Sequence, residues 1–407
     1  MSSSTDVVEA PAAVHESSAR SRLAEALRHP AALWTAPALI YLVVRQIGLF
    51  VLQLVVDYQN KIRGGTSTAA GELKSWDGEW FLGIAEHGYN DVPLRLTDAA
   101  GRRSAETPLA FFPGYPALIR WVDGLPGVDV AGAAFAVSLI SGLFCTYGLF
   151  VLGRAVRGGS TRSGLILVTL FAASPMAVVL SMTYAEATFC AFAVWALVGV
   201  VKKHWILAGV CCAAAGLVRP TAAALIAAVG LAAIVAVIAD RRDWRAWIGA
   251  LIAPLGMLGY LAWVSVRTGD LDGWFGVQQR GWGSKFDGGA ATLQFTFDHL
   301  GNPRSVLETG TVWLLVLAII LVVHAFRRRL EWPLIVYGLG VLVMDIGSNG
   351  LMNSKARLLL PAFTLLIPLA LMLARRRTST LLTALGLATV MSAWFGAYSL
   401  AVWQYAI

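Results

Sequence analysis

The stretch AALWTAPALIYLVVRQIGLFVLQLVV, residues Ala31–Val56, is apolar along its length and carries one charged side chain, that of Arg45. A transmembrane helix needs about 20 predominantly apolar residues, so this stretch is long enough to span a bilayer. No convincing cleavage site follows it, and we therefore expect no cleavable signal peptide. Arg45 lies within the span and is expected to face protein. Residues 1–30 are expected to form a cytoplasmic N-terminal tail, in which Arg20–Arg28 could form a short interfacial helix.

The rest of the chain repeats this apolar pattern. Of its 407 residues, 57% are hydrophobic and only 14% are charged, whereas soluble domains are about a quarter charged. A soluble fold could not bury that much apolar surface. The fold class is therefore predicted to be an all-α polytopic membrane protein, with a single transmembrane domain over 31–407. The apolar runs predict about eleven transmembrane helices, near 31–56, 129–153, 163–181, 184–201, 205–218, 221–239, 246–266, 308–326, 332–348, 357–374 and 379–404.

The basic residues indicate how these helices are oriented. The formal net charge is +8, but the basic residues recur as short clusters between apolar runs, which argues against nucleic-acid binding and follows the positive-inside rule. With the N-terminus in the cytoplasm, the short outer loops hold only Arg219, Lys355 and Arg357. The C-terminus is then expected outside. The short inner loops hold Arg154, Arg157, Arg162, Lys202, Lys203, Arg241, Arg242, Arg245, Arg327, Arg328, Arg329, Arg375, Arg376 and Arg377.

Two outer segments, roughly 57–128 and 267–307, are too long to be simple connections, and loops of this length usually carry function. Both are rich in Trp, Gly and charged residues. The cysteines lie inside apolar runs, without metal-site spacing or an evident disulfide pair, and are expected to be small packing residues. They are Cys145, Cys190, Cys211 and Cys212.

The most informative part of the first outer segment is KSWDGEWFLGIAEHGY, residues 74–89. Read as a helix, it places Trp76, Trp80, Phe81 and Ile84 on one side, which predicts an amphipathic helix on the outer leaflet with its tryptophans at the interface. Asp77 begins this helix, where a carboxylate is favoured. Asp77 could be a simple N-cap or a chemical group presented outward.

Five segments, in order, resemble the motifs of the PIG-V mannosyltransferases. Trp76-Asp77-Gly78-Glu79-Trp80, followed by Ile84–Tyr89, is similar to the first-loop motif. The later segments resemble the family's aromatic-Pro, Tyr-Ser-Glu, Arg-Pro and Arg-Phe-Leu-Pro motifs. They are Phe111–Pro116, Thr183–Glu186, Gly216–Pro220 and Arg357–Pro361. The chain departs from the family pattern at Gly114, Ala185 and Leu358.

The resemblance covers about residues 30–375 and is to members of the actinobacterial type. It implies a bundle of the GT-C glycosyltransferase type that uses a lipid-phosphate sugar without a metal, with Asp77 as the catalytic base. The outward position of the polar residues favours a similar donor. Nucleotide sugars are cytoplasmic, but the polar residues face outward, so a sugar donor there would be carried on a lipid such as a polyprenyl phosphate. Transfer needs a carboxylate to take the acceptor proton and cations to stabilise the departing phosphate.

The outer cations are candidates for binding that phosphate. A guanidinium binds phosphate through two parallel contacts, so we assign Arg357, Lys355 and Arg219 to the donor phosphate. Alternatively, they extend to lipid headgroups. No cofactor is expected, and no metal-binding spacing is present.

Further polar and aromatic residues are candidates for binding the sugar or the acceptor. Gln279, Arg280 and Trp282, in the second outer segment, could stack on and bond a sugar, or form a hairpin anchored in the interface. Glu186 and Asp345 lie near outer span ends. A carboxylate at membrane depth usually indicates a functional site. Alternatively, either residue could form a structural pair with Arg219 or Lys355. The full set is Trp76, Glu79, Trp80, His87, Glu186, Gln279, Arg280 and Trp282.

The sequence therefore predicts an inverting mannosyltransferase of the cell membrane, with its active site on the outer side. Its expected partners are a polyprenyl-phosphate sugar, a lipid-linked or glycolipid acceptor and the bilayer, with no nucleic acid. The alternative is a transporter or flippase of a lipid-linked sugar, which would show inverted repeats and broken helices at the membrane midplane.

Overall fold

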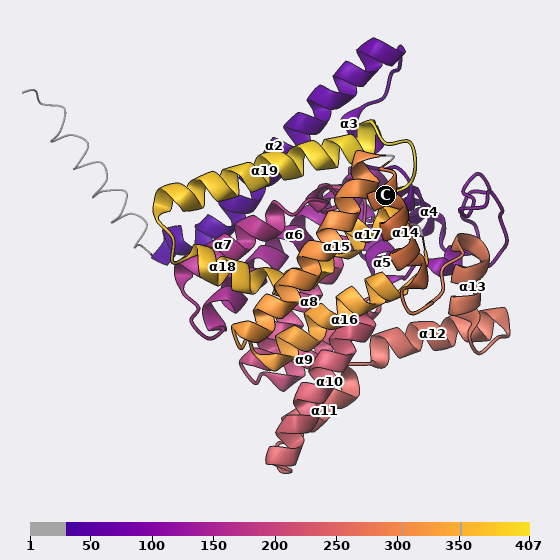
Figure 1. Cartoon of the computed structure of the whole chain (residues 1–407). Coiled ribbons are helices and arrows are strands. Elements are labelled where there is room, and N and C mark those ends of the chain that lie inside the picture. The colour runs from indigo at the N-terminus through magenta and orange to yellow at the C-terminus, as the bar shows by residue number, and fades with distance from the viewer. Residues whose placement is uncertain (1–29, 304, 351) are drawn as a thin grey trace, which may run out of the picture.

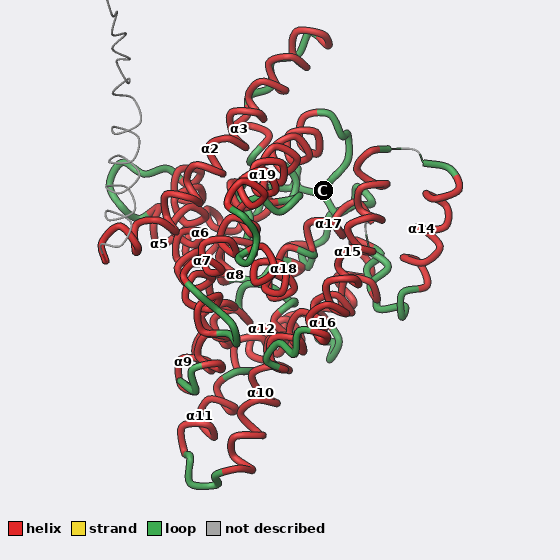
Figure 2. Tube along the Cα trace, turned by 60° about the vertical axis from the view of Figure 1, so that its left-hand side comes forward, coloured by secondary structure: helices red, strands yellow, loops and turns green. Residues whose placement is uncertain are grey.

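The computed structural model describes residues 30–303, 305–350 and 352–407. The predicted Arg20–Arg28 helix and the rest of the tail before Pro30 lie outside these residues. Within the described residues every regular element is a helix, apart from one isolated bridge between Phe286 and Ser348 (Figure 2). The predicted all-α fold class is confirmed.

Among the residues that the structure describes, six helical segments are long and apolar enough to cross a membrane. They are α2 (Pro30–Arg63), α6 (Val130–Ala155), α10 (Ala222–Ala239), the pair α11 (Trp244–Ile252) and α12 (Leu255–Thr268), α15 (Val306–Arg327) and α19 (Thr378–Ala401).

A seventh candidate is a broken span, bent by 50°. It joins η3 (Met352–Ser354) and α17 (Lys355–Leu358) to η4 (Leu360–Leu366) and α18 (Ile367–Leu373). Four shorter apolar helices complete the set, so each predicted span has a helical counterpart among the described residues. They are α7 (Thr161–Ala172), α8 (Glu186–Val201), α9 (Trp205–Gly216) and α16 (Trp332–Gly347).

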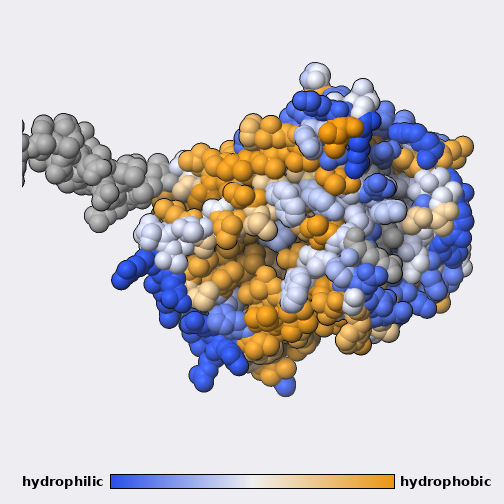
Figure 3. Space-filling view, turned by 45° about the horizontal axis from the view of Figure 1, so that its top comes forward, coloured by the Kyte–Doolittle hydropathy of each residue, from blue (hydrophilic) through white to orange (hydrophobic). Residues whose placement is uncertain are grey.

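The surface has the pattern of a membrane protein. An apolar band covers much of the face in Figure 3 and separates two hydrophilic rims. Side chains such as Leu39, Phe50, Ile238 and Trp313 are exposed within spans, and exposed apolar area of this extent needs lipid to cover it. The chain is a multi-pass membrane protein.

Prolines account for the breaks within spans, because proline removes a backbone donor and clashes with the preceding turn. Pro254 separates α11 from α12, and Pro361 lies at the start of η4. Pro175 follows the end of α7, after which the chain continues as the 3-10 helix η2 (Ala177–Ser181). The predicted span 163–181 is therefore a short helix, a break and a second short element.

Arg45 supplies hydrogen-bond donors to backbone carbonyl groups at this break. Its guanidinium donates to the carbonyl oxygens of Ala172, at 2.7 Å, and Ala177, at 2.5 Å. The side chain is 6% exposed. The expectation that Arg45 faces protein is confirmed, and its role is to bind the carbonyls that the broken helix leaves free.

The outer segments contain short helices of their own. α2 continues to Arg63, beyond the predicted end at Val56, and is followed by α3 (Ala69–Glu72), α4 (Asp77–His87), η1 (Thr107–Ala110) and α5 (Gly114–Asp123). The second segment holds α13 (Gly273–Trp282) and α14 (Ala290–Gly301).

The predicted helix after Trp76 is α4, but its tryptophans do not both face the lipid interface. Trp80 is only 5% exposed and stacks on Phe111, with ring centroids 5.1 Å apart. The interfacial interpretation is therefore wrong for Trp80, because the aromatic motif after η1 covers that face of α4. Trp76 is 42% exposed.

Contacts between loops form two groups, one among the predicted cytoplasmic loops and one among the predicted outer segments. On the side predicted to be cytoplasmic, the backbone N–H of Arg157 donates to Glu331 at 2.7 Å, and Arg162 donates to the carbonyl of Arg376 at 2.9 Å. The outer segments contact one another instead, as described below. α19 packs along α2, and the C-terminus lies beside α17 (Figure 1).

Candidate active site

Asp77 is the first residue of α4 and follows a strained turn. Trp76 has φ 59° and ψ −119°, a conformation that a bulky side chain rarely adopts. The Tyr184 hydroxyl holds this turn: it accepts a hydrogen bond from the Asp77 N–H and donates one to the Ser75 carbonyl, each at 3.3 Å. Gly78 completes the turn, because a Cβ there would collide with the Thr183 hydroxyl. The turn before Asp77 is thus fixed by Thr183 and Tyr184.

The Asp77 carboxylate is paired with an arginine far along the chain. Nη1 of Arg357 donates to Oδ2 of Asp77 at 2.6 Å. The N-cap position belongs to Trp76, so the alternative that Asp77 is the N-cap is wrong. The Asp77 side chain is 31% exposed, whereas that of Arg357 is 9% exposed. A ligand can therefore reach the carboxylate while the protein holds the cation.

Arg357 has two further partners in the interior. Its Nε lies 3.6 Å from Oε1 of Glu186, and the guanidinium carbon lies 5.1 Å from the ring centroid of Tyr184. A stacked ring and two carboxylates fix the plane of the guanidinium. Lysine could not reproduce this arrangement, because its ammonium is a point charge.

Glu186 links Arg219 to Arg357. The side chain of Glu186 is fully buried and its Oε1 forms an ion pair with Nη1 of Arg219. Glu186 is also the first residue of α8, where the helix dipole stabilises a carboxylate. Glu186 was predicted either to act in the reaction or to pair with Arg219 or Lys355, and the structure shows the pairing with Arg219. Two carboxylates and two guanidiniums thus form one network over α4, α8, α17 and the segment before α10.

The segments that resemble family motifs converge here. The Thr183 N–H donates to the Leu73 carbonyl at 3.1 Å, just before the first motif, and the Gly114 N–H donates to the Leu217 carbonyl at 2.7 Å, two residues before Arg219. A Cβ on Gly114 would lie 2.8 Å from that oxygen. The departure from the family pattern at Gly114 is therefore matched to this close approach.

An aromatic cluster lies beside the network. Trp282 of the second outer segment contacts the rings of Trp80, at 6.4 Å, and Phe111, at 5.6 Å, between centroids. The Arg103 guanidinium lies 5.4 Å from the Trp80 ring centroid. Trp282 is partly exposed, so its ring can contact a ligand.

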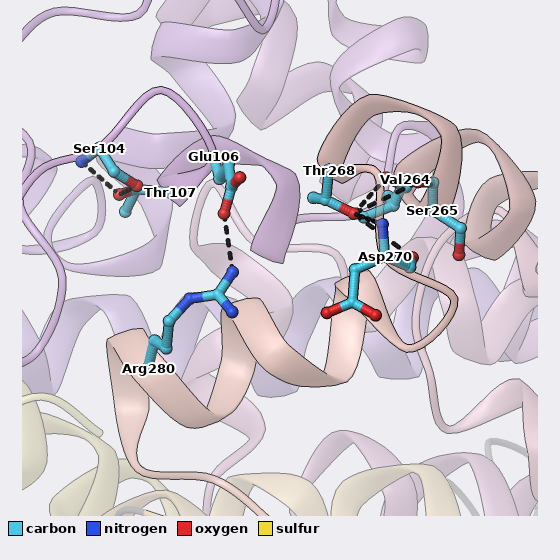
Figure 4. A network of polar contacts seen from close by, with 8 residues as sticks. All are labelled: Ser104, Glu106, Thr107, Val264, Ser265, Thr268, Asp270 and Arg280. Carbon is cyan, nitrogen blue, oxygen red and sulfur yellow. Dashed lines mark hydrogen bonds and ion pairs between the residues drawn. The ribbon is translucent and has the colours of Figure 1, made fainter.

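The two outer segments are also joined by polar contacts. Arg280 donates to Glu106 at 2.7 Å, as Figure 4 shows, and Gln278 donates to the Ala110 carbonyl at 3.1 Å. Gln279 is exposed. The structure thus places Arg280 in an ion pair between loops.

The other predicted site residues lie outside the Asp77–Arg357 network. Lys355 is 1% exposed and donates to the carbonyls of Asp345, at 2.5 Å, and Ser348, at 2.7 Å. Glu79 lies 3.9 Å from Arg95, and His87 lies 3.5 Å from Glu86, both at the surface. Lys355 thus closes the C-terminal end of α16.

The second outer segment is attached to that same end of α16. The Asp287 N–H donates to the Gly347 carbonyl at 2.8 Å, and the Asn349 N–H donates to the Lys285 carbonyl at 3.0 Å. Hydrogen bonds from the N–H groups of Ala291 and Gly289 hold the pKa of Asp287 below its usual value. The second outer segment is therefore fixed to α16, the span that precedes Arg357.

Sequence reasoning did not identify the role of Tyr184. The residue lies within the Thr183–Glu186 segment, so the motif itself was the available signal. Its contacts with Ser75, Asp77 and Arg357 depend on how α8 meets α4, which a single sequence does not specify. Among the described residues, no group of three or more His, Cys, Asp or Glu side chains could hold a metal ion.

Comparison with known proteins gives a partial sequence match and a structural match. No protein-family profile matches the chain. The chain is 29% identical over 131 residues to the GPI mannosyltransferase pigv-1 of Caenorhabditis elegans, a match that covers 29% of this chain and 17% of the relative. This similarity confirms the predicted PIG-V resemblance over the matched residues, and the predicted actinobacterial type stays a prediction. The match covers only a small part of the relative.

The solved structure is that of ArnT from Cupriavidus metallidurans in the apo state. The superposition has a TM-score of 0.49 and 16% sequence identity, and it covers 74% of this chain and 56% of the ArnT chain.

Proposed function

We propose that this chain is a membrane glycosyltransferase, an inverting mannosyltransferase that uses a polyprenyl-phosphate sugar and a lipid-linked or glycolipid acceptor at the outer face of the cell membrane. The contact between Asp77 and Arg357 carries the proposal. It places a reachable carboxylate, suited to accept a proton, directly beside a buried cation, suited to bind a phosphate. The similarity to a mannosyltransferase supports mannose as the sugar.

The contact gives each partner a role in the reaction. The acceptor hydroxyl oxygen attacks the anomeric carbon, the bond from that carbon to the phosphate oxygen breaks, and the lipid phosphate leaves with the electron pair. The hydroxyl proton passes to Asp77. Arg357 neutralises the phosphate, and a phosphate that draws on this guanidinium leaves the Asp77 carboxylate freer to accept the proton. Attack opposite the leaving group inverts the anomeric centre.

Asp77 is preferred to the other nearby carboxylates as the base. Glu186 is fully buried between two arginines, and Glu79 points to Arg95 at the surface. Arg219 is proposed to contribute positive charge near the phosphate site, where it is held by its ion pair with Glu186. Lys355 contributes by fixing the backbone before Arg357.

The sugar and the acceptor are proposed to lie beside Asp77, over the aromatic cluster. Trp76 and Trp282 offer exposed ring surface, and sugars stack on such rings. Further contacts at the rim of this surface are proposed from Glu79, His87, Gln279 and Arg280, while the buried Trp80 supports the Trp282 ring.

The test uses purified protein, radiolabelled polyprenyl-phosphate mannose and a crude lipid extract. We expect label to appear in a new glycolipid with inverted anomeric configuration, with the lipid donor but not with a nucleotide sugar alone, and after exhaustive chelation of metals. Transfer from a nucleotide sugar alone would refute the donor, and activity restored only by an added metal would refute metal independence. A transporter would instead move the labelled donor across a proteoliposome membrane without forming a product.

A further inference from the structure

The side chain of Tyr184 lies between the two groups on which the proposed reaction depends. Tyr184 is fully buried and lies just before α8. Its hydroxyl contacts the turn that carries Asp77, whereas its ring contacts the Arg357 guanidinium. Asp77 and Arg357 also contact each other directly. The three residues therefore form a closed set of contacts, with Tyr184 on its buried side.

The Tyr184 hydroxyl acts on the backbone at the start of α4. It accepts a hydrogen bond from the Asp77 N–H and donates one to the Ser75 carbonyl, so a single hydroxyl serves as both donor and acceptor. These two bonds span Trp76, whose φ of 59° is unfavourable for a bulky side chain. Without them, the turn can relax and shift the first residue of α4. The hydroxyl therefore fixes the position of the Asp77 carboxylate.

The Tyr184 ring acts on the cation instead. The guanidinium carbon of Arg357 lies 5.1 Å from the ring centroid, within the range of a favourable cation–π contact. The Arg357 Nε also lies 3.6 Å from Glu186. Neither contact involves Asp77, so both persist when a phosphate draws the guanidinium away from that carboxylate. The ring therefore supports Arg357 with and without a bound phosphate.

We propose that Tyr184 is a positioning residue that serves the base and the phosphate-binding cation through different parts of one side chain. The hydroxyl positions Asp77 for proton transfer, and the ring positions Arg357 for the donor phosphate. The inference rests on the proposed function, since it takes Asp77 as the base and Arg357 as the phosphate ligand. A buried, rigid ring joins the two contacts and so fixes how the two reacting groups lie relative to each other.

Two substitutions separate the hydroxyl from the ring. Tyr184→Phe removes only the hydroxyl, and we expect it to lower kcat about tenfold through a misplaced Asp77, with the KM for polyprenyl-phosphate mannose unchanged. Tyr184→Leu removes the ring as well, and it should also raise that KM about tenfold, because the buried cation–π contact is lost. A wild-type kcat in Tyr184→Phe, or the same donor KM in the two variants, would overturn the proposal.

Tyr260 of α12 provides a matched control. It is buried, and its hydroxyl donates to the Phe111 carbonyl of the first outer segment at 2.7 Å. Tyr260 belongs with Phe112 and Trp274 to a buried cluster separate from the one that contains Tyr184. Tyr260→Phe should therefore lower the thermal midpoint in detergent but leave kcat and the donor KM near wild type. A loss of kcat in Tyr260→Phe as large as that in Tyr184→Phe would mean that any lost buried hydroxyl slows the enzyme, and would overturn the proposal.

A double-variant cycle tests whether the hydroxyl acts through Asp77. In an Asp77→Asn background, Tyr184→Phe should cause no further loss of rate, because the placement of the carboxylate matters only while it accepts the proton. Additive losses in the double variant would show that the hydroxyl acts on another group, and the positioning of Asp77 by Tyr184 would be wrong.

Binding of radiolabelled polyprenyl phosphate to the purified protein tests the ring without turnover. Wild type and Tyr184→Phe should bind it equally, and Tyr184→Leu about tenfold more weakly. Weaker binding by Tyr184→Phe would overturn the proposal even where Tyr184→Leu does not fold, as would equal binding by a folded Tyr184→Leu protein. If the wild-type chain transfers no sugar but the affinities follow this order, the proposed function fails and the support of Arg357 by the ring stands. If it transfers sugar and the affinities do not follow this order, the proposed function stands and this inference fails.

Discussion

At the scale of single residues, the chemistry depends on a pair that no local pattern connects. Asp77 and Arg357 lie 280 residues apart in sequence and 2.6 Å apart in space. Each was identifiable from its own motif and its predicted outer position. Their contact was not, because it depends on how α4 and α17 meet across the bundle.

The Asp77 carboxylate is expected to be required for turnover but not for folding. Asp77→Asn keeps the size of the side chain and can still accept a hydrogen bond from Arg357, but it cannot take a proton at neutral pH. We expect the initial rate at saturating donor to fall by roughly 10²-fold or more, with binding of the lipid phosphate retained. The control is Glu86→Gln, which alters an exposed carboxylate on the same helix and should be mild. Near-normal turnover in folded Asp77→Asn protein would remove Asp77 from the mechanism.

Arg357 is expected to need its planar guanidinium and not only its charge. Arg357→Lys keeps one positive charge, but an ammonium cannot contact Asp77 and Glu186 together while lying on the Tyr184 ring. We expect kcat to fall by about 10²-fold and the donor KM to rise. Arg95→Lys is the matched surface control. Unchanged kinetics in Arg357→Lys would show that the contacts of Arg357 with Asp77 and Glu186 serve the fold and not the reaction.

At the scale of elements, hydrophobic runs located the spans but not their breaks. Apolar stretches predicted a helix at each of the observed positions, because lipid requires continuous apolar surface. Pro175 and Pro361 were visible, but the sequence did not show that the spans containing them become short helices and 3-10 turns. The end of α2 at Arg63 was also missed, because polar residues after Val56 resemble a loop once the helix has left the apolar region.

The break after α7 gives a prediction about stability. Arg45→Met fills a similar volume but removes both donors to the Ala172 and Ala177 carbonyls. Leaving buried acceptors unpaired costs about 1–3 kcal/mol, so the thermal midpoint in detergent should fall. The comparison is Arg63→Met, at the exposed end of α2, which should melt like the wild type. An unchanged midpoint in Arg45→Met would mean that the break is held by other contacts.

At the scale of the whole molecule, loop contacts sort into the two sides predicted from charge. The segments with Arg157, Arg162 and Arg376 contact one another or Glu331, whereas the segments with Asp77, Arg280 and Lys285 contact other predicted outer segments. These contacts agree with the relative sides predicted for those loops, and the sidedness of the remaining loops stays a prediction. The fit between the two outer segments could not be predicted from the sequence, because Trp282 and Arg280 act through partners in a different loop.

The orientation in the membrane is the remaining prediction, and cysteine labelling in intact cells tests it. The positive-inside rule places the loop at Arg328 in the cytoplasm and Ser284 outside. An impermeant thiol reagent should therefore label Ser284→Cys but not Arg328→Cys before the cells are opened, and should label both afterwards. The native chain provides the background, since Cys145, Cys190 and Cys212 are buried and Cys211 is only partly exposed. The reverse pattern would place the Asp77–Arg357 pair in the cytoplasm. A nucleotide sugar could then reach the site directly, and the argument for a lipid-linked donor would lose its premise.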